Sequence, residues 1–211
     1  MIPVSDERVA ELLARAGGGD QLAVNELFAQ HRERLRLMIT VRMDPRLLGR
    51  VDPSDVVQDT LIEAMRKLSQ FIQDRPIAFY PWLRQLAWNR LIDLYRFHIQ
   101  GAKRRVDREM HMGTALSDES IASFARYLVA GQPSPSSELV RSELRHRVRA
   151  ALESLPDKYR ESLAMRHLEQ LSIREIATIV GAPEGTIKAR LFRGLKILQQ
   201  LLADPTTGVE S

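Results

Sequence analysis

The chain has 211 residues, the length of two small domains, and its 44% apolar and 27% charged residues exclude a wholly disordered protein. It contains no cysteine, which excludes a disulfide scaffold, a thiolate nucleophile and cysteine-ligated zinc or iron–sulfur sites. The net charge of +4 is too small to identify a partner, so the informative quantity is where the charge lies along the chain.

Targeting and catalytic signals are missing from the sequence. No apolar run approaches the roughly 20 residues of a membrane helix, and the first residues, with Asp6 and Glu7, lack the basic and hydrophobic parts of a signal peptide. We therefore expect a cytoplasmic protein with no membrane insertion. The five histidines show no metal-ligand spacing, and Gly17 to Gly19 lack the strand and Lys-Ser/Thr of a phosphate loop. We expect no catalytic site, no metal and no cofactor.

Helical periodicity in almost every segment predicts an all-α fold. A first helix is expected over residues 5–16, and Asp20 offers a carboxylate cap for a second helix that is interrupted at residues 44–49. Asp52 and Pro53 then supply a capping carboxylate and a proline at the first helical position, so a third helix should begin there.

The third helix is predicted to have an apolar and an acidic face. It should end near Phe71, and its predicted buried positions are Val57, Leu61, Met65 and Leu68. Asp55, Asp59 and Glu63 are four residues apart and share the other face. For Asp55, compensation of the helix dipole explains the acid as well as a partner contact does, whereas Glu63 lies too deep in the helix for that role.

A fourth helix is predicted over residues 82–99, after an aromatic loop that includes Phe79. One face is apolar, and the other carries Trp88, Ile92 and Tyr95 beside Asn89 and Arg96. Exposed aromatic side chains next to cations favour stacking on unpaired bases. The alternative is that Trp88 and Tyr95 are buried under the first helix or the linker. Beyond this helix, the basic residues Lys103, Arg104 and Arg105 favour a nucleic-acid interface.

The second half of the chain is predicted to form a separate helical domain. Apolar periodicity weakens over residues 106–137, where Gly, Pro and Ser indicate a flexible linker with one isolated helix over residues 117–130. Helices are then expected over residues 137–155 and 158–170. We therefore predict small helical domains at residues 1–105 and 138–203, a linker at 106–137 and a disordered tail at 204–211.

A helix-turn-helix is predicted over residues 172–202. Ser172 and Glu175 fit a capping box, the helix ends at Gly181, and Pro183 opens the last helix. That helix places small residues and cations opposite its apolar side, which would let it approach a DNA groove. These residues are Gly185, Thr186, Ala189, Arg193 and Lys196, with Lys188 and Arg190 on the flanks. The alternative is a solvated basic face on a packing helix.

These motifs, in this order, resemble a bacterial RNA polymerase sigma factor of the extracytoplasmic-function (ECF) group of the sigma-70 family. Residues 52–61, DPSDVVQDTL, look like the core-binding stretch of region 2, and residues 82–93, WLRQLAWNRLID, look like its promoter-melting helix. Region 4 is matched by residues 155–156, 159–161, 172–177 and 184–191. The resemblance covers about residues 20–105 and 138–202.

The resemblance implies a region 2 bundle and a region 4 helix-turn-helix that bind core RNA polymerase (clamp and flap) and promoter DNA, both duplex and non-template single strand. The implied core-binding residues are Asp55, Gln58, Asp59 and Glu63. The implied residues for the minus-ten element are Phe71, Phe79, Trp88, Asn89, Arg96, Lys103, Arg104 and Arg105. Those for the minus-thirty-five element are Arg174, Glu184, Gly185, Thr186, Lys188, Ala189, Arg190, Arg193 and Lys196.

As a specificity subunit, such a protein would have no catalytic site of its own. An anti-sigma factor is a further partner that the resemblance allows, since it would clamp the same apolar and acidic faces. Two other functions fit part of the sequence. One is a stand-alone helix-turn-helix regulator whose N-terminal domain senses a ligand or dimerises. The other is a protein-interaction module to which DNA binding is incidental.

Overall fold

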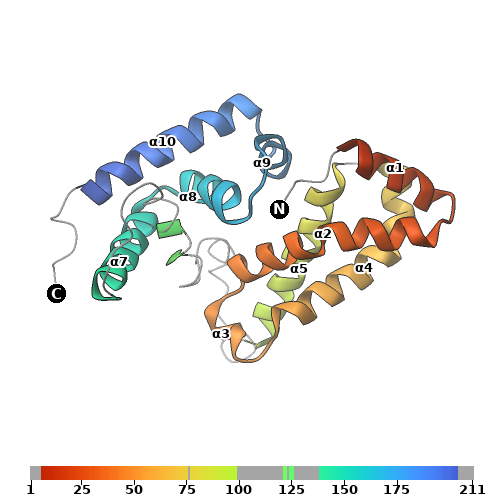
Figure 1. Cartoon of the computed structure of the whole chain (residues 1–211), viewed down its shortest axis with the longest axis horizontal. Helices are drawn as coiled ribbons and strands as arrows, with labels where there is room; N and C mark the ends of the chain where they lie inside the picture. Colours follow the sequence, from red (N-terminus) through yellow and green to blue (C-terminus); the bar gives the residue numbers. More distant parts are fainter. Residues whose placement is uncertain (1–5, 76, 99–120, 123, 126–137, 204–211) are drawn as a thin grey trace. The chain divides into compact units, whose positions relative to one another are not determined.

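The structure is a computed structural model that describes residues 6–75, 77–98, 121–122, 124–125 and 138–203 (Figure 1). The chain divides into unit 1, residues 1–106, and unit 2, residues 107–211. Every regular element in the described ranges is a helix, and none is a strand, which confirms the predicted all-α class. The tail at 204–211 and all of the predicted linker helix except 121–122 and 124–125 lie outside these ranges.

Unit 1 is a bundle in which α2, α4 and α5 pack against one another and α1 lies against α2 (Figure 1). Its helices are α1 (Asp6–Gly17), α2 (Gln21–Arg42), α3 (Pro45–Leu48), α4 (Pro53–Asp74) and α5 (Phe79–His98). The predicted caps are confirmed: Asp20 accepts hydrogen bonds from the backbone N–H groups of Leu22 and Ala23, and Asp52 accepts one from Ser54.

Two expectations for α4 and α5 are wrong. Helix α4 continues to Asp74 and α5 already begins at Phe79, so the connection is shorter than the predicted aromatic loop. Met65 was predicted to be buried, but it is 46% exposed. At 100° per residue, Met65 falls at the edge of the apolar stripe, and only the placement of the neighbouring helices decides on which side of that edge it lies.

Unit 2 contains the predicted helix-turn-helix. Its helices are α7 (Glu138–Ser154), α8 (Asp157–Leu163), η2 (Ala164–Leu168), α9 (Ile173–Val180) and α10 (Glu184–Ala203). The single helix expected over 158–170 is instead α8 followed by η2, a π-helical segment in which the turns widen. The capping box of Ser172 and Glu175 is present, and Gly181 takes the left-handed conformation that ends α9.

The close approach of α10 to α8 depends on a glycine. Gly194 is buried, and a Cβ atom built on it would lie 3.2 Å from Leu163 Cδ1 and 3.2 Å from Tyr159 Cβ. The orientation of α8 is set in turn by Arg160, whose guanidinium is buried and donates to the carbonyls of Leu152 and Glu153 at the end of α7. These contacts fix the face that α10 turns to solvent.

We predict that Gly194→Val lowers the free energy of unfolding by about 1 to 3 kcal/mol, because the added carbons overpack the contact between α10 and α8. Gly185→Val is the matched control, since nothing lies within 4 Å of its Cβ position on the same helix. Denaturation followed by circular dichroism measures the effect, and fluorescence of Trp82 and Trp88 reports unit 1 separately. Equal stability of the two variants would contradict this packing.

Candidate nucleic-acid and partner interfaces

The solvent-facing side of α4 is acidic, but it also has an apolar centre that the sequence analysis missed. Asp55 and Gln58 are exposed, and Ile62 and Met65 are 47% and 46% exposed beside them. Helical periodicity could have indicated the exposure of Ile62, because a residue seven positions after Asp55 lies on the same helical face. Exposed apolar side chains within a polar rim are typical of a protein-binding surface. We call Asp55, Gln58, Ile62 and Met65 the α4 face.

Two of the acids predicted on this helix already have partners within unit 1. Arg90 Nη2 donates to Asp59 Oδ2 at 2.6 Å, which joins α5 to α4, and Lys67 Nζ donates to Glu63 Oε1 at 2.6 Å within α4. Among the described residues, Asp55 makes no side-chain hydrogen bond or ion pair with another side chain. Of the three acids, Asp55 is therefore the one whose carboxylate is open to a partner.

The outer side of α5 presents polar residues over a partly buried aromatic layer. Asn89 and Arg96 are exposed, whereas Trp88 and Tyr95 are half-buried and pack against the core. The outcome lies between the two alternatives for this helix, since both residues pack against the core and neither is fully buried. Lys103, Arg104 and Arg105 fall outside the described residues.

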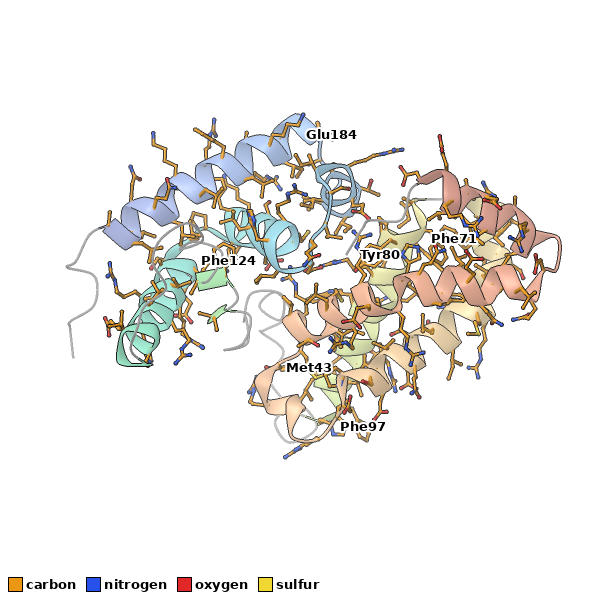
Figure 2. All side chains as sticks on the ribbon, in the orientation of Figure 1. Met43, Phe71, Tyr80, Phe97, Phe124 and Glu184 are labelled. Atoms are coloured by element: carbon orange, nitrogen blue, oxygen red, sulfur yellow. The ribbon has the colours of Figure 1, made fainter. Side chains whose placement is uncertain are left out.

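Phe71 and Phe79, which the resemblance implies for the minus-ten element, are core residues that lie within α4 and α5. They are 4% and 3% exposed (Figure 2 shows Phe71). The ring of Phe71 stacks on Trp82 at 4.4 Å and meets the edge of Phe79 at 5.6 Å between centroids. The buried rings stabilise the bundle through their contacts with one another and are not exposed to a ligand. The sequence identified the ring types but could not reveal their packing.

The C-terminal part of α5 is tied to α3. Arg46 donates to Asp44 through Nε and Nη2, at 3.0 and 2.8 Å, and its Nη2 also donates to the Tyr95 hydroxyl at 2.9 Å. The hydrogen bonds from Arg46 hold the pKa of the Asp44 carboxyl below its usual value. Near this anchor, Phe97 is 78% exposed (Figure 2).

Helix α10 turns its predicted DNA-facing residues to solvent. Glu184 begins the helix (Figure 2), and Gly185, Thr186, Lys188, Ala189, Arg193 and Lys196 are all exposed. Arg190 is half-buried at the side of this surface. Ile187, Leu191, Gly194 and Leu198 are buried on the opposite side, and Leu195 on that side is half-buried. The structure also exposes Phe192 by 70%, a residue that the sequence analysis did not assign. The sequence pattern could have indicated Phe192, because this residue lies between Lys188 and Lys196 on the helical wheel.

Arg174 lies at the start of α9, where it is exposed. Because α9 precedes α10 in the helix-turn-helix, Arg174 and the α10 residues come from the two helices of one motif. The described residues contain no group of His, Cys, Asp and Glu that could hold a metal ion. No helix among them is long and apolar enough to span a membrane.

A short segment before α7 contributes to the interior of unit 2. Ile121 and Phe124 are 3% and 1% exposed, and the ring of Phe124 meets the edge of His167 at 5.8 Å between centroids (Figure 2). Burial, and to a lesser extent the neighbouring charge of Arg166, lower the pKa of His167 to about 4. Part of the predicted linker therefore packs with the helix-turn-helix unit.

Comparison with known proteins identifies the class to which these two units belong. Residues 27–98 match the family described as sigma-70 region 2, and residues 145–198 match the family described as sigma-70, region 4. The ECF RNA polymerase sigma-E factor of Escherichia coli K12 is 30% identical over 86% of this chain and 87% of its own length. The chain belongs to the sigma-70 family, as a member of its ECF group.

Other relatives agree with this assignment over nearly the whole chain. The ECF RNA polymerase sigma-E factor of Haemophilus influenzae is 28% identical over 89% of this chain and 92% of its own length. The solved structure of CnrH in complex with the cytosolic domain of CnrY has a TM-score of 0.54 and 26% identity. That alignment covers 96% of this chain and 100% of the solved chain.

The lowered pKa of His167 predicts a pH-dependent stability of unit 2. Its ordinary value of 6.5 applies to the unfolded chain, so between pH 6.5 and pH 4 the unfolded state binds more protons than the folded state. The contribution of His167 to the free energy of unfolding is therefore complete above pH 6.5 and is lost as the pH falls toward 4.

His167→Gln should flatten this part of the stability profile, whereas His146→Gln, a control at an exposed histidine of α7, should leave it unchanged. Denaturation followed by circular dichroism across this pH range measures both profiles. If His167→Gln kept the full decline in stability on acidification, the decline would come from other groups.

Proposed function

We propose that this protein binds core RNA polymerase and directs it to promoters, where it recognises the promoter elements and opens the DNA. The observation that carries the proposal is the exposed face of α10, which joins small residues to Arg193 and Lys196 on the second helix of a helix-turn-helix. Small residues permit close approach to a groove, and the cations reach base edges or phosphates. With Arg174, this surface would bind the minus-thirty-five element.

Unit 1 would supply the polymerase contact and the contact to the minus-ten element. The α4 face offers an open carboxylate and two exposed apolar side chains, a combination that suits a basic and partly apolar partner surface, and we assign this contact to the polymerase clamp. On α5, Asn89 would hold a base extruded from the non-template strand, Trp88 would border that site, and Arg96 would contact phosphates. Lys103, Arg104 and Arg105 would continue the phosphate path.

The proposed partners of the protein are the core enzyme and promoter DNA. Because both are found in the cytoplasm, we propose that the protein acts there. Unit 2 would contact the polymerase flap as well as DNA. The protein would be a specificity subunit and contribute no catalytic group, since the polymerase itself supplies the chemistry. An anti-sigma factor would compete for the same surfaces, because the exposed Ile62 and Met65 suit any partner that covers α4.

Run-off transcription tests this function. With core polymerase and fragments of the organism's own genome as templates, we expect transcripts that require the protein. Arg193→Ala should weaken binding to such a duplex promoter by about 1 to 3 kcal/mol and lower transcription from it, because Arg193 would contact a base or a phosphate. Lys158→Ala removes the same charge from an exposed site on α8 and serves as the control.

The two arms of this experiment fail in different ways. Transcription that never depends on the protein would overturn the sigma function and leave a stand-alone regulator as the alternative. If transcription depends on the protein but Arg193→Ala and Lys158→Ala behave alike, the function stands and the assignment of the recognition surface to α10 is wrong.

A further inference from the structure

An ion pair joins the helix proposed to bind polymerase to the helix proposed to open the promoter. Arg90 Nη2 lies 2.6 Å from Asp59 Oδ2, and the two residues are 31 positions apart in the chain. Their side chains are 38% and 48% exposed, so the pair lies at the surface between α4 and α5. A hydrogen bond between charged groups is short and directional, which makes it sensitive to the rotation of one helix against the other.

The position of this pair along α5 is informative. Towards the N-terminus of α5, Trp82 stacks on Phe71 of α4 at 4.4 Å, and towards its C-terminus the Tyr95 hydroxyl accepts a hydrogen bond from Arg46 at 2.9 Å. Arg90 contacts α4 between these two anchors, and it directly follows Asn89. Any rotation of the middle of α5 would therefore move Asn89, the residue proposed to hold the extruded base.

The same ion pair makes the Asp59 carboxylate less available to the polymerase. Its carboxylate is already bound to Arg90, whereas the carboxylate of Asp55 has no side-chain partner among the described residues. A cation of the polymerase that reached Asp59 would have to compete with Arg90, but one that reached Asp55 would not. The direct polymerase contact is thus better assigned to Asp55 than to Asp59.

We propose that Asp59 and Arg90 are positioning residues for promoter opening: their ion pair fixes the middle of α5 so that Asn89 faces the unpaired strand. This inference rests on the proposed sigma function. Because the pair is partly exposed, its effect is limited, and we expect its loss to lower promoter opening about two- to fivefold.

The test compares full-length variants with the wild-type protein in complex with core polymerase. Asp59→Asn and Arg90→Gln each break the pair, and the exchange Asp59→Arg with Arg90→Asp restores it with the charges reversed. Glu33→Gln is the control, because it breaks the exposed pair of Glu33 with Arg36 inside α2 without touching α4 or α5. Thermal unfolding checks that each variant is folded.

Two quantities are measured for each variant. The first is the affinity for core polymerase, for which Asp55→Arg provides a reference of lost binding. The second is the ratio of run-off transcription from a duplex promoter to transcription from the same promoter with the minus-ten region premelted by mismatches. Premelting removes the opening step, so a defect in positioning α5 should affect the duplex template more strongly.

We expect Asp59→Asn and Arg90→Gln to lower the duplex-to-premelted ratio about two- to fivefold without a change in core affinity, and the charge exchange to restore the ratio. Glu33→Gln should behave as wild type. The proposal is overturned if Asp59→Asn alone weakens core binding and the exchange does not restore it, since Asp59 would then contact the polymerase directly.

An unchanged ratio in both single variants would overturn the proposal equally, because the pair would then be a surface contact without a role in opening. A failure of the proposed function itself looks different. In that case the wild-type protein would neither bind core polymerase nor support transcription, and Asp55→Arg would make no difference.

Discussion

The packing of α5 against α4 is the constraint on which the interfaces of unit 1 depend. The connection between the helices is short, so they run antiparallel, and the rings of Phe71, Phe79 and Trp82 lock together at that end. This aromatic contact fixes which side of each helix is buried. Two surfaces therefore stay exposed and available to partners: the acidic and apolar side of α4, and the side of α5 that carries Asn89. A loss of the aromatic contact would disturb both surfaces at once.

In unit 2, packing contacts also determine which surface is exposed, but the contacts are of a different kind. Arg160 binds the carbonyls at the end of α7 and orients α8, and Gly194 lets α10 approach α8 closely. This contact buries the apolar side of α10, so the small and basic residues of α10 face solvent. In both units, close packing on one side of a helix therefore determines the chemistry presented on the other side.

Much of this arrangement was predictable from the sequence, because caps and periodicity act locally. Asp20, Asp52 and the pair of Ser172 and Glu175 mark helix starts by satisfying nearby backbone donors, and such signals do not depend on the rest of the fold. Met65 was predicted to be buried and is exposed, because its burial depends on the placement of the neighbouring helices. The pairing of Asp59 with Arg90 was out of reach for the same reason, since nothing in the sequence relates positions 31 residues apart.

Site-specific photocrosslinking in one transcription complex tests most directly whether the two units face different partners. A photoreactive residue would replace Met65 on α4 or Phe192 on α10, both of which are exposed. We predict that the probe at position 65 labels core polymerase and the probe at position 192 labels duplex DNA upstream of the start site. DNA labelling from position 65, or polymerase labelling alone from position 192, would contradict this account.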